Sequence, residues 1–117
     1  MLNHRAQKMA SMIRGEVARL LLTEISDPRL RHLVVTEVEL SKDLRHAKVF
    51  YEGSPTTDHK EVTRGLAKAV VFFRRKIGAN LDLKFVPELS FEADEHAGRL
   101  NRILSVLEEN KMELPNE

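Results

Sequence analysis

Hydrophobic residues recur at every third or fourth position along roughly the first 25 residues of the chain. This spacing places them on one side of an α-helix, so the sequence predicts an amphipathic helix over about residues 4–25. The helix is expected to end before Asp27-Pro28, because proline disfavours helical geometry in the residue that precedes it. The residues of the hydrophobic stripe are Met9, Ile13, Val17, Leu20, Leu21 and Ile25.

Residues 34–40 change to a period of two, which is typical of a half-buried β-strand. A second strand is predicted over residues 47–52, and the short segment Ser41 to His46 between them suits a hairpin. The hairpin is expected to gather basic residues at one edge of the sheet, namely Lys42, Arg45 and Lys48. On the first strand, the period of two groups Val34, Thr36, Val38 and Leu40 on one face.

A second helix is predicted after the loop at residues 53–57. Asp58 and Glu61 match a capping box at its start, and Gly78 is expected to cap its end. The buried stripe of this helix is predicted to contain Val62, Leu66, Ala69, Phe73 and Ile77. The opposite side carries the basic residues Arg64, Lys68 and Arg75.

A third strand is predicted over residues 83–91, where apolar residues alternate again. Pro87 lies within it, so this strand is expected at a sheet edge or with a bulge. A last helix is indicated by Leu100, Ile103, Leu104 and Leu107. Three strands and helices with one apolar stripe each predict an α+β two-layer sandwich. We expect one domain over residues 1–109 and a frayed acidic tail over 110–117.

Charge is distributed unevenly along the 117 residues, although the net charge is only +1. Residues 1–85 contain 16 Lys or Arg against 10 Asp or Glu, whereas residues 86–117 contain 3 against 8. A basic body of this kind favours a polyanionic partner, although solvated surfaces produce similar patterns. The longest apolar run, Ala69 to Phe73, is far too short to cross a bilayer, so a cytoplasmic protein is expected.

The second helix contains the densest basic cluster. With the hairpin residues, it defines a candidate RNA-binding surface of Lys42, Arg45, Lys48, Arg64, Lys68, Arg74, Arg75 and Lys76. Each phosphate that such a surface neutralises releases counterions, which would make binding strongly salt-dependent. The alternative is an ordinary solvated helix face. Phe72 is the one candidate for base stacking in this helix, although partial burial is the favoured interpretation, and Phe73 fits the core.

Catalytic and metal chemistry are not indicated. The five histidines lack metal-ligand spacing, and the chain has no cysteine. Glu92, Asp94 and Glu95 lie at a strand-to-helix junction where acidic residues favour capping, and no nucleophile accompanies them. We therefore predict no metal, no cofactor, no small-molecule substrate and no enzymatic activity.

Three segments in the right order resemble the ribosome-binding factor A family of small-subunit assembly factors. They are the first helix with Asp27-Pro28-Arg29, the hairpin from Val38 to Phe50, and Val86 to Phe91 with Asp94. The resemblance implies a type II KH-like fold with a helix-kink-helix in place of the glycine-rich RNA clamp. The family marks this kink with an alanine, any residue, then glycine, whereas this chain has Ala69-Val70-Val71. A kink is expected from the resemblance alone.

The resemblance also implies a function. It implies binding to free small (30S) ribosomal subunits through ribosomal RNA, a part in late maturation and 16S rRNA processing, and a role in growth in the cold. We also expect the protein to be a monomer. Two alternatives remain open from the residues. One is a general single-stranded nucleic-acid module. The other is a protein-interaction adaptor that offers the edge around Leu83 to Leu89 to a partner strand.

Overall fold

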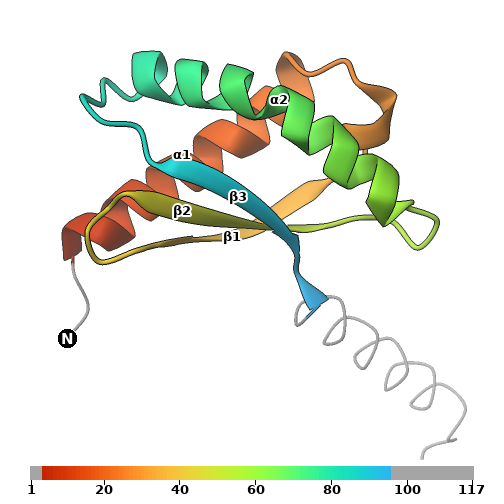
Figure 1. The fold of residues 1–117 in the computed structure, drawn as a ribbon, viewed down its shortest axis with the longest axis horizontal. Coiled ribbons are helices and arrows are strands. Elements are labelled where there is room, and N and C mark those ends of the chain that lie inside the picture. The colour runs from red at the N-terminus through yellow and green to blue at the C-terminus, as the bar shows by residue number, and fades with distance from the viewer. Residues whose placement is uncertain (1–3, 96–117) are drawn as a thin grey trace, which may run out of the picture.

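Two helices cover one face of a three-stranded sheet in the computed structural model of the chain, which describes residues 4–95 (Figure 1). The α+β two-layer architecture predicted from the hydrophobic pattern is thereby confirmed. The predicted last helix and acidic tail lie outside the described residues. The elements are α1 His4–Thr23, the 3-10 helix η1 Pro28–Leu30, β1 Val34–Leu40, β2 His46–Glu52, α2 His59–Asn80 and β3 Glu88–Ala93.

The sheet has the order β1-β2-β3, with β1 antiparallel to β2 and β3 parallel to β2. The predicted hairpin and the predicted edge position of the third strand are both confirmed. The third strand, however, begins at Glu88 and not at Leu83, because Pro87 has no N–H to donate to a ladder. Its first ladder bond runs from the Glu88 N–H to the Arg45 carbonyl (2.8 Å). Residues 83–87 therefore form a loop.

The face assignment on β1 was wrong in its first half. A bulge shifts the register between Val35 and Glu37, so the buried residues are Val35 and Val38, while Val34 is 61% exposed. A bulge adds one residue to one strand and reverses the faces on one side of it. The sequence pattern cannot show this shift, because it depends on how β1 pairs with β2.

Only the Asp58 half of the predicted capping box is seen at the start of α2, since the Glu61 carboxylate pairs with Arg64 and Arg29, and the predicted end of the helix is wrong. The Asp58 side chain accepts hydrogen bonds from the N–H groups of Lys60 and Glu61. Gly78 is not a cap, since the helix continues to Asn80 and none of the glycines within residues 4–95 has a positive φ. A Cβ added at Gly78 would lie 2.8 Å from Val86 Cγ2, so the glycine allows the loop before β3 to approach the helix.

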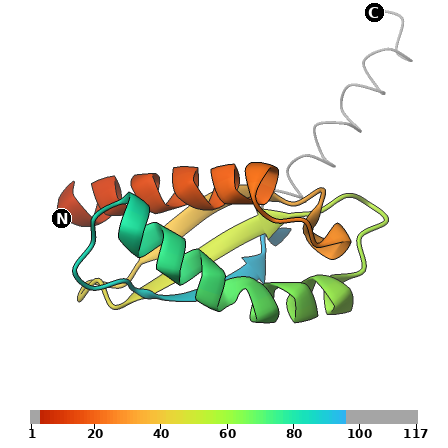
Figure 2. The ribbon, with the colours of Figure 1, turned by 90° about the horizontal axis from the view of Figure 1, so that it is seen from above.

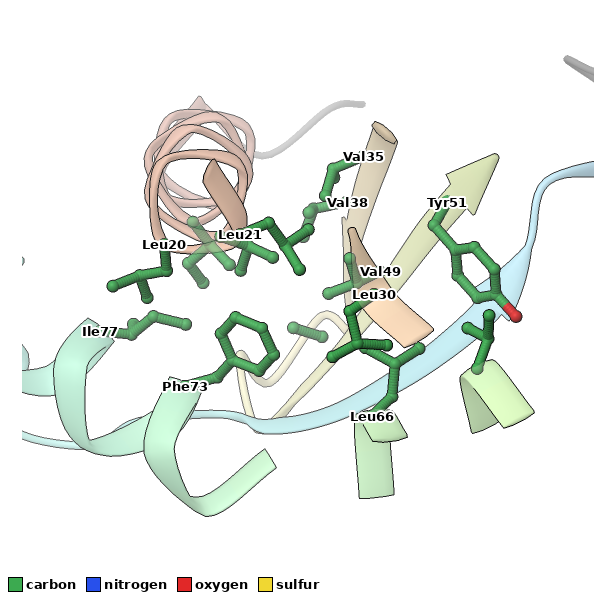
Figure 3. Close-up of a cluster of buried hydrophobic side chains, with 14 residues drawn as sticks. Leu20, Leu21, Leu30, Val35, Val38, Val49, Tyr51, Leu66, Phe73 and Ile77 are labelled. Atoms are coloured by element: carbon green, nitrogen blue, oxygen red, sulfur yellow. The ribbon is translucent and has the colours of Figure 1, made fainter. Parts of the chain in front are cut away.

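The core lies between the helices and the sheet. Phe73 and Ile77 of α2 point toward Leu20 and Leu21 of α1 (Figure 3), and Phe73 also meets Phe91 of β3 with ring centroids 5.6 Å apart. Burial of a side chain such as Phe73 contributes roughly 1.5–3 kcal/mol. The predicted stripes of both helices face this core, except that Ile25 follows the end of α1.

The connection between α1 and the sheet contains a turn that the sequence pattern did not predict. Asp27 caps η1 by accepting from the Arg29 N–H, and its carboxylate also pairs with the Arg29 guanidinium (2.8 Å). This guanidinium lowers the pKa of Asp27 to about 2. Gly65 of α2 leaves room for Leu30 beside it. Within residues 4–95, neither helix has a stretch long and apolar enough to cross a membrane.

Candidate nucleic-acid interface

The β1–β2 hairpin turn presents two basic side chains on a fixed backbone. The Asp43 carboxylate accepts from the Ser41 hydroxyl (2.6 Å) and from the Arg45 N–H (3.1 Å), and both bonds lower the pKa of Asp43. Leu44 adopts a left-handed conformation (φ 63°) in this turn. Lys42 and Arg45 are exposed, and neither side chain forms an ion pair with another residue of the described part of the chain. Their charges are available to a partner.

The second half of α2 lies toward the same end of the molecule as the hairpin turn (Figures 1 and 2). Arg75 is exposed there, with its guanidinium carbon 5.7 Å from the centre of the Phe72 ring. Lys76 Nζ lies at the same distance from that ring. Phe72 is half-buried, as favoured from the sequence, and its ring already contacts two cations. Arg75 is therefore grouped with Lys42 and Arg45 as an exposed cation at this end of the molecule. Phe72 is poorly suited to stack on a base, because its ring is half-buried and already contacts two cations.

Arg74 has a different environment from its neighbour. Its Nε donates to the Pro87 carbonyl (3.2 Å) and its Nη2 to the Val86 carbonyl (3.0 Å). Pro87 is fully buried. The guanidinium therefore joins α2 to the loop that leads into β3, a role that residue type alone did not reveal.

Lys76 takes part in a group of polar contacts between α1 and α2. Its ammonium lies 3.2 Å from the Glu24 carboxylate. Beside it, the buried Glu16 accepts from Arg19 (2.7 Å) and from the Asn80 amide (2.5 Å). The Arg19 hydrogen bond is the main reason that the pKa of Glu16 is lowered. Lys76 therefore contributes to holding the helices together.

Arg64 and Lys68 lie on the first half of α2, away from the hairpin turn (Figure 2). Arg64 pairs with Glu61 of the same helix (2.7 Å). Lys68 has no ion pair within residues 4–95 and borders a shallow hollow between α2 and the α1–η1 connection, which Phe72 also lines. These two residues form a separate basic region.

Lys48 lies on the face of the sheet opposite to α1 and α2, beside Glu92 of β3 (3.3 Å). The alternation of buried and exposed residues puts several carboxylates on this face with it. They are Glu37, Glu39, Glu52, Glu88 and Glu92. The structure thus separates Lys48 from the other predicted cations and surrounds it with negative charge.

The axis of α2 changes direction near the middle of the helix in both ribbon views, although the helical backbone is continuous from His59 to Asn80 (Figures 1 and 2). A bend in this helix was expected from the family resemblance. Its assignment to Ala69, Val70 and Val71 stays a prediction. Val71, the residue that the resemblance sets against the family's glycine, is 70% exposed, so its side chain needs no space in the core.

Phe85 was missed by the sequence reasoning, which placed it in a strand. It lies in the loop before β3 and is 87% exposed. Pro87 was the available signal, since proline within a strand is found at its first residue, at an edge or at a bulge. No cluster of three or more metal-ligating side chains occurs among the described residues.

Comparison with known proteins identifies the family of this chain. A family model described as ribosome-binding factor A matches residues 5–107. The chain belongs to the ribosome-binding factor A family. The ribosome-binding factor A of Halothermothrix orenii is 36% identical, with 95% of this chain and 94% of that protein aligned. That of Thermodesulfovibrio yellowstonii is 41% identical, over 92% of this chain and 91% of the relative.

Solved structures of the family share the fold. The crystal structure of ribosome-binding factor A from Thermus thermophilus aligns with a TM-score of 0.68 at 23% identity, covering 75% of this chain and 94% of that one. A homology model of ribosome-binding factor A from the same organism was fitted into a cryo-EM map of a 30S complex, and it aligns with a TM-score of 0.60 at 23% identity, covering 77% and 91%. The agreement extends to the three-stranded sheet and two helices.

Proposed function

We propose that this protein is a non-enzymatic assembly factor that binds the free small ribosomal subunit through its ribosomal RNA. It acts as a cytoplasmic monomer during late maturation of the subunit and aids the processing of 16S rRNA. Family membership supports the proposal, as does the Thermus thermophilus relative placed in a 30S complex. The carrying observation on this chain is the group of cations at one end, Lys42, Arg45 and Arg75, which are exposed and free of ion pairs within residues 4–95.

Unpaired cations are better suited to phosphate than paired ones, because no existing ion pair must be broken on binding. Three phosphate contacts give a slope of log K against log salt of about −2 on single strands and about −2.7 on duplex. Lys68 adds a fourth contact if the RNA follows α2. Lys48, Arg74 and Lys76 are assigned to the fold in this proposal, since each already has a partner.

The test is co-sedimentation of the protein with purified small subunits, large subunits and intact ribosomes at several salt concentrations. We expect binding to free small subunits that weakens as salt rises. Equal binding to all RNA-containing particles would indicate a general nucleic-acid module instead. Binding that does not change with salt would indicate a protein-interaction adaptor.

A pair of double variants tests the surface itself. Lys42→Glu with Arg45→Glu is expected to lower the affinity for small subunits at least tenfold and to reduce the salt slope by about 1.4–1.8. The matched control is Arg31→Glu with Lys60→Glu, which makes the same change in net charge at the opposite end of the fold. An equal loss in both variants would overturn the assignment of the hairpin turn.

A further inference from the structure

Phe85 differs from the other aromatic residues of the described part of the chain because its side chain is exposed to solvent. It is 87% exposed, whereas the other aromatic side chains of residues 4–95, Phe50, Tyr51, Phe72, Phe73 and Phe91, are buried or half-buried. No ring or cation within the described residues contacts the Phe85 ring. Exposure of a large aromatic surface to water is unfavourable by roughly 25 cal/mol per Å², so it is usually buried unless a partner covers it.

The loop that carries Phe85 is anchored on both sides. On the helix side, the Leu83 N–H donates to the Gly78 carbonyl (3.0 Å). On the strand side, Arg74 holds the carbonyls of Val86 and Pro87. The backbone around Phe85 is therefore fixed, and the ring is presented to solvent at a defined position.

Exposed acidic residues, Asp82 and Glu88, flank the loop that carries Phe85, and unpaired cations lie at the same end of the molecule. The exposed Lys84 precedes Phe85 and has no ion pair within residues 4–95. The Glu88 N–H bonds to the Arg45 carbonyl, which brings the end of the loop beside the hairpin turn. The loop and the hairpin turn lie at the same end of the molecule in both views (Figures 1 and 2). An aromatic ring among unpaired cations is the arrangement that proteins use to hold single-stranded nucleic acid.

We propose that Phe85 is a base-stacking residue, which receives an unpaired nucleobase of the bound RNA while Lys84 and the hairpin cations contact the neighbouring phosphates. This inference rests on the proposed function and specifies the RNA class: a single-stranded segment, because a base within a helix offers no free face. Every base has a π-face, so the contact contributes affinity without sequence preference.

Substitutions of Phe85 separate stacking from other contacts. Phe85→Ala is expected to lower affinity for small subunits about 5- to 150-fold, the range that corresponds to roughly 1–3 kcal/mol per stacked base. The salt slope stays unchanged, because no phosphate contact is lost. Phe85→Tyr retains the affinity, and Phe85→Leu does not. Leu22→Ala, at an 84% exposed position on α1, is the control and is expected to bind like the wild type.

Two outcomes would overturn the inference while leaving the proposed function intact. If the wild type binds small subunits and Phe85→Ala binds equally well, the ring has no role. If Phe85→Leu binds as tightly as the wild type, the contact is a general apolar one. Failure of the wild type itself to bind would instead overturn the proposed function.

A spectroscopic measurement tests stacking directly. The chain contains no tryptophan, so Phe85→Trp introduces a single indole. Addition of small subunits is expected to quench its fluorescence, and the quenching is expected to reverse at high salt as the RNA dissociates. Unchanged emission in a variant that still co-sediments would contradict stacking.

Discussion

The second half of α2 and the β1–β2 hairpin turn both expose basic residues, yet the two regions hold their charges differently. On α2, Arg74 bonds to two backbone carbonyls, and Lys76 pairs with Glu24. In the hairpin turn, Lys42 and Arg45 have no such side-chain partners within residues 4–95. Similar residues in similar clusters therefore serve the fold in one region and are free to bind in the other.

Charge-reversing substitutions have different consequences in the two regions. A reversal on α2 that includes Arg74 or Lys76 breaks contacts within the protein, so a loss of binding could follow from altered structure. A reversal in the hairpin turn breaks no side-chain ion pair or hydrogen bond within residues 4–95, although the pKa of Asp43, which the Ser41 hydroxyl lowers most, is also lowered by the charge of Arg45. Arg75 is the exception on α2, because its contact is with the half-buried Phe72 ring and not with a charged or carbonyl group.

The largest effect is predicted for Arg74→Glu. It removes two hydrogen bonds from a charged donor and brings a carboxylate toward two carbonyl oxygens, so the free energy of unfolding should fall by roughly 2–3 kcal/mol. Arg45→Glu in the hairpin turn and Arg75→Glu should each change it by less than about 0.5 kcal/mol. Urea unfolding of the three variants measures the difference. Equal stabilities would remove the distinction between the two regions.

The sequence predicted the elements well because their hydrophobic residues repeat locally. The stripes that contain Ile13 and Phe73 are helical patterns that need no knowledge of the partner surface. The alternation around Leu89 also gave the correct inward face of β3. Asp58 was identifiable as a cap because a cap acts on N–H groups two and three residues away.

The remaining features depend on contacts between distant residues. Val34 is exposed because a bulge forms when β1 pairs with β2. Gly78 serves the approach of Val86 and not the end of the helix. Arg74 finds its acceptors 12 and 13 residues further along the chain. Composition indicated a basic surface, but only the partners of each side chain show which charges are free.

Two glycine-to-alanine substitutions test whether the loop that Arg74 holds packs closely against α2. Gly15 lies on the exposed side of α1 with nothing within 4 Å of an added Cβ, so Gly15→Ala should stabilise the protein by about 0.5–1 kcal/mol through helix propensity. Gly78→Ala forces the added methyl against Val86, and such overpacking typically costs about 1–3 kcal/mol.

Thermal or urea unfolding of the two alanine variants gives the result directly. Gly78→Ala should be at least about 1 kcal/mol less stable than Gly15→Ala, and hydrogen exchange of the Leu83 amide should accelerate because its acceptor is the Gly78 carbonyl. If both variants are stabilised alike, the loop is not packed closely against α2.

The smallest expected effect is on the pH dependence of stability. It involves two carboxylates, that of Asp27, which pairs with a guanidinium, and that of Asp43 in the hairpin turn. The Arg29 guanidinium and N–H lower the pKa of Asp27 to about 2, whereas the Ser41 hydroxyl and the Arg45 N–H lower the pKa of Asp43. A lowered pKa means that the folded state favours the charged form. For both groups the stabilisation is therefore complete above the unfolded value near 4 and is lost as the pH falls below it; for Asp27 the loss extends to about pH 2.

Asp27→Asn should flatten the dependence of the unfolding free energy on pH between about 4 and 2, because asparagine still caps η1 but does not titrate. Asp43→Asn should flatten it less, because a hydroxyl and one amide favour a carboxylate less than a guanidinium does. Urea unfolding from pH 7 to pH 2 measures both slopes. A larger change for Asp43→Asn would mean that the folded state stabilises the charged form of Asp43 more than that of Asp27. The hairpin turn would then depend on its own charged contacts, which would contradict the proposed difference between it and the rest of the fold.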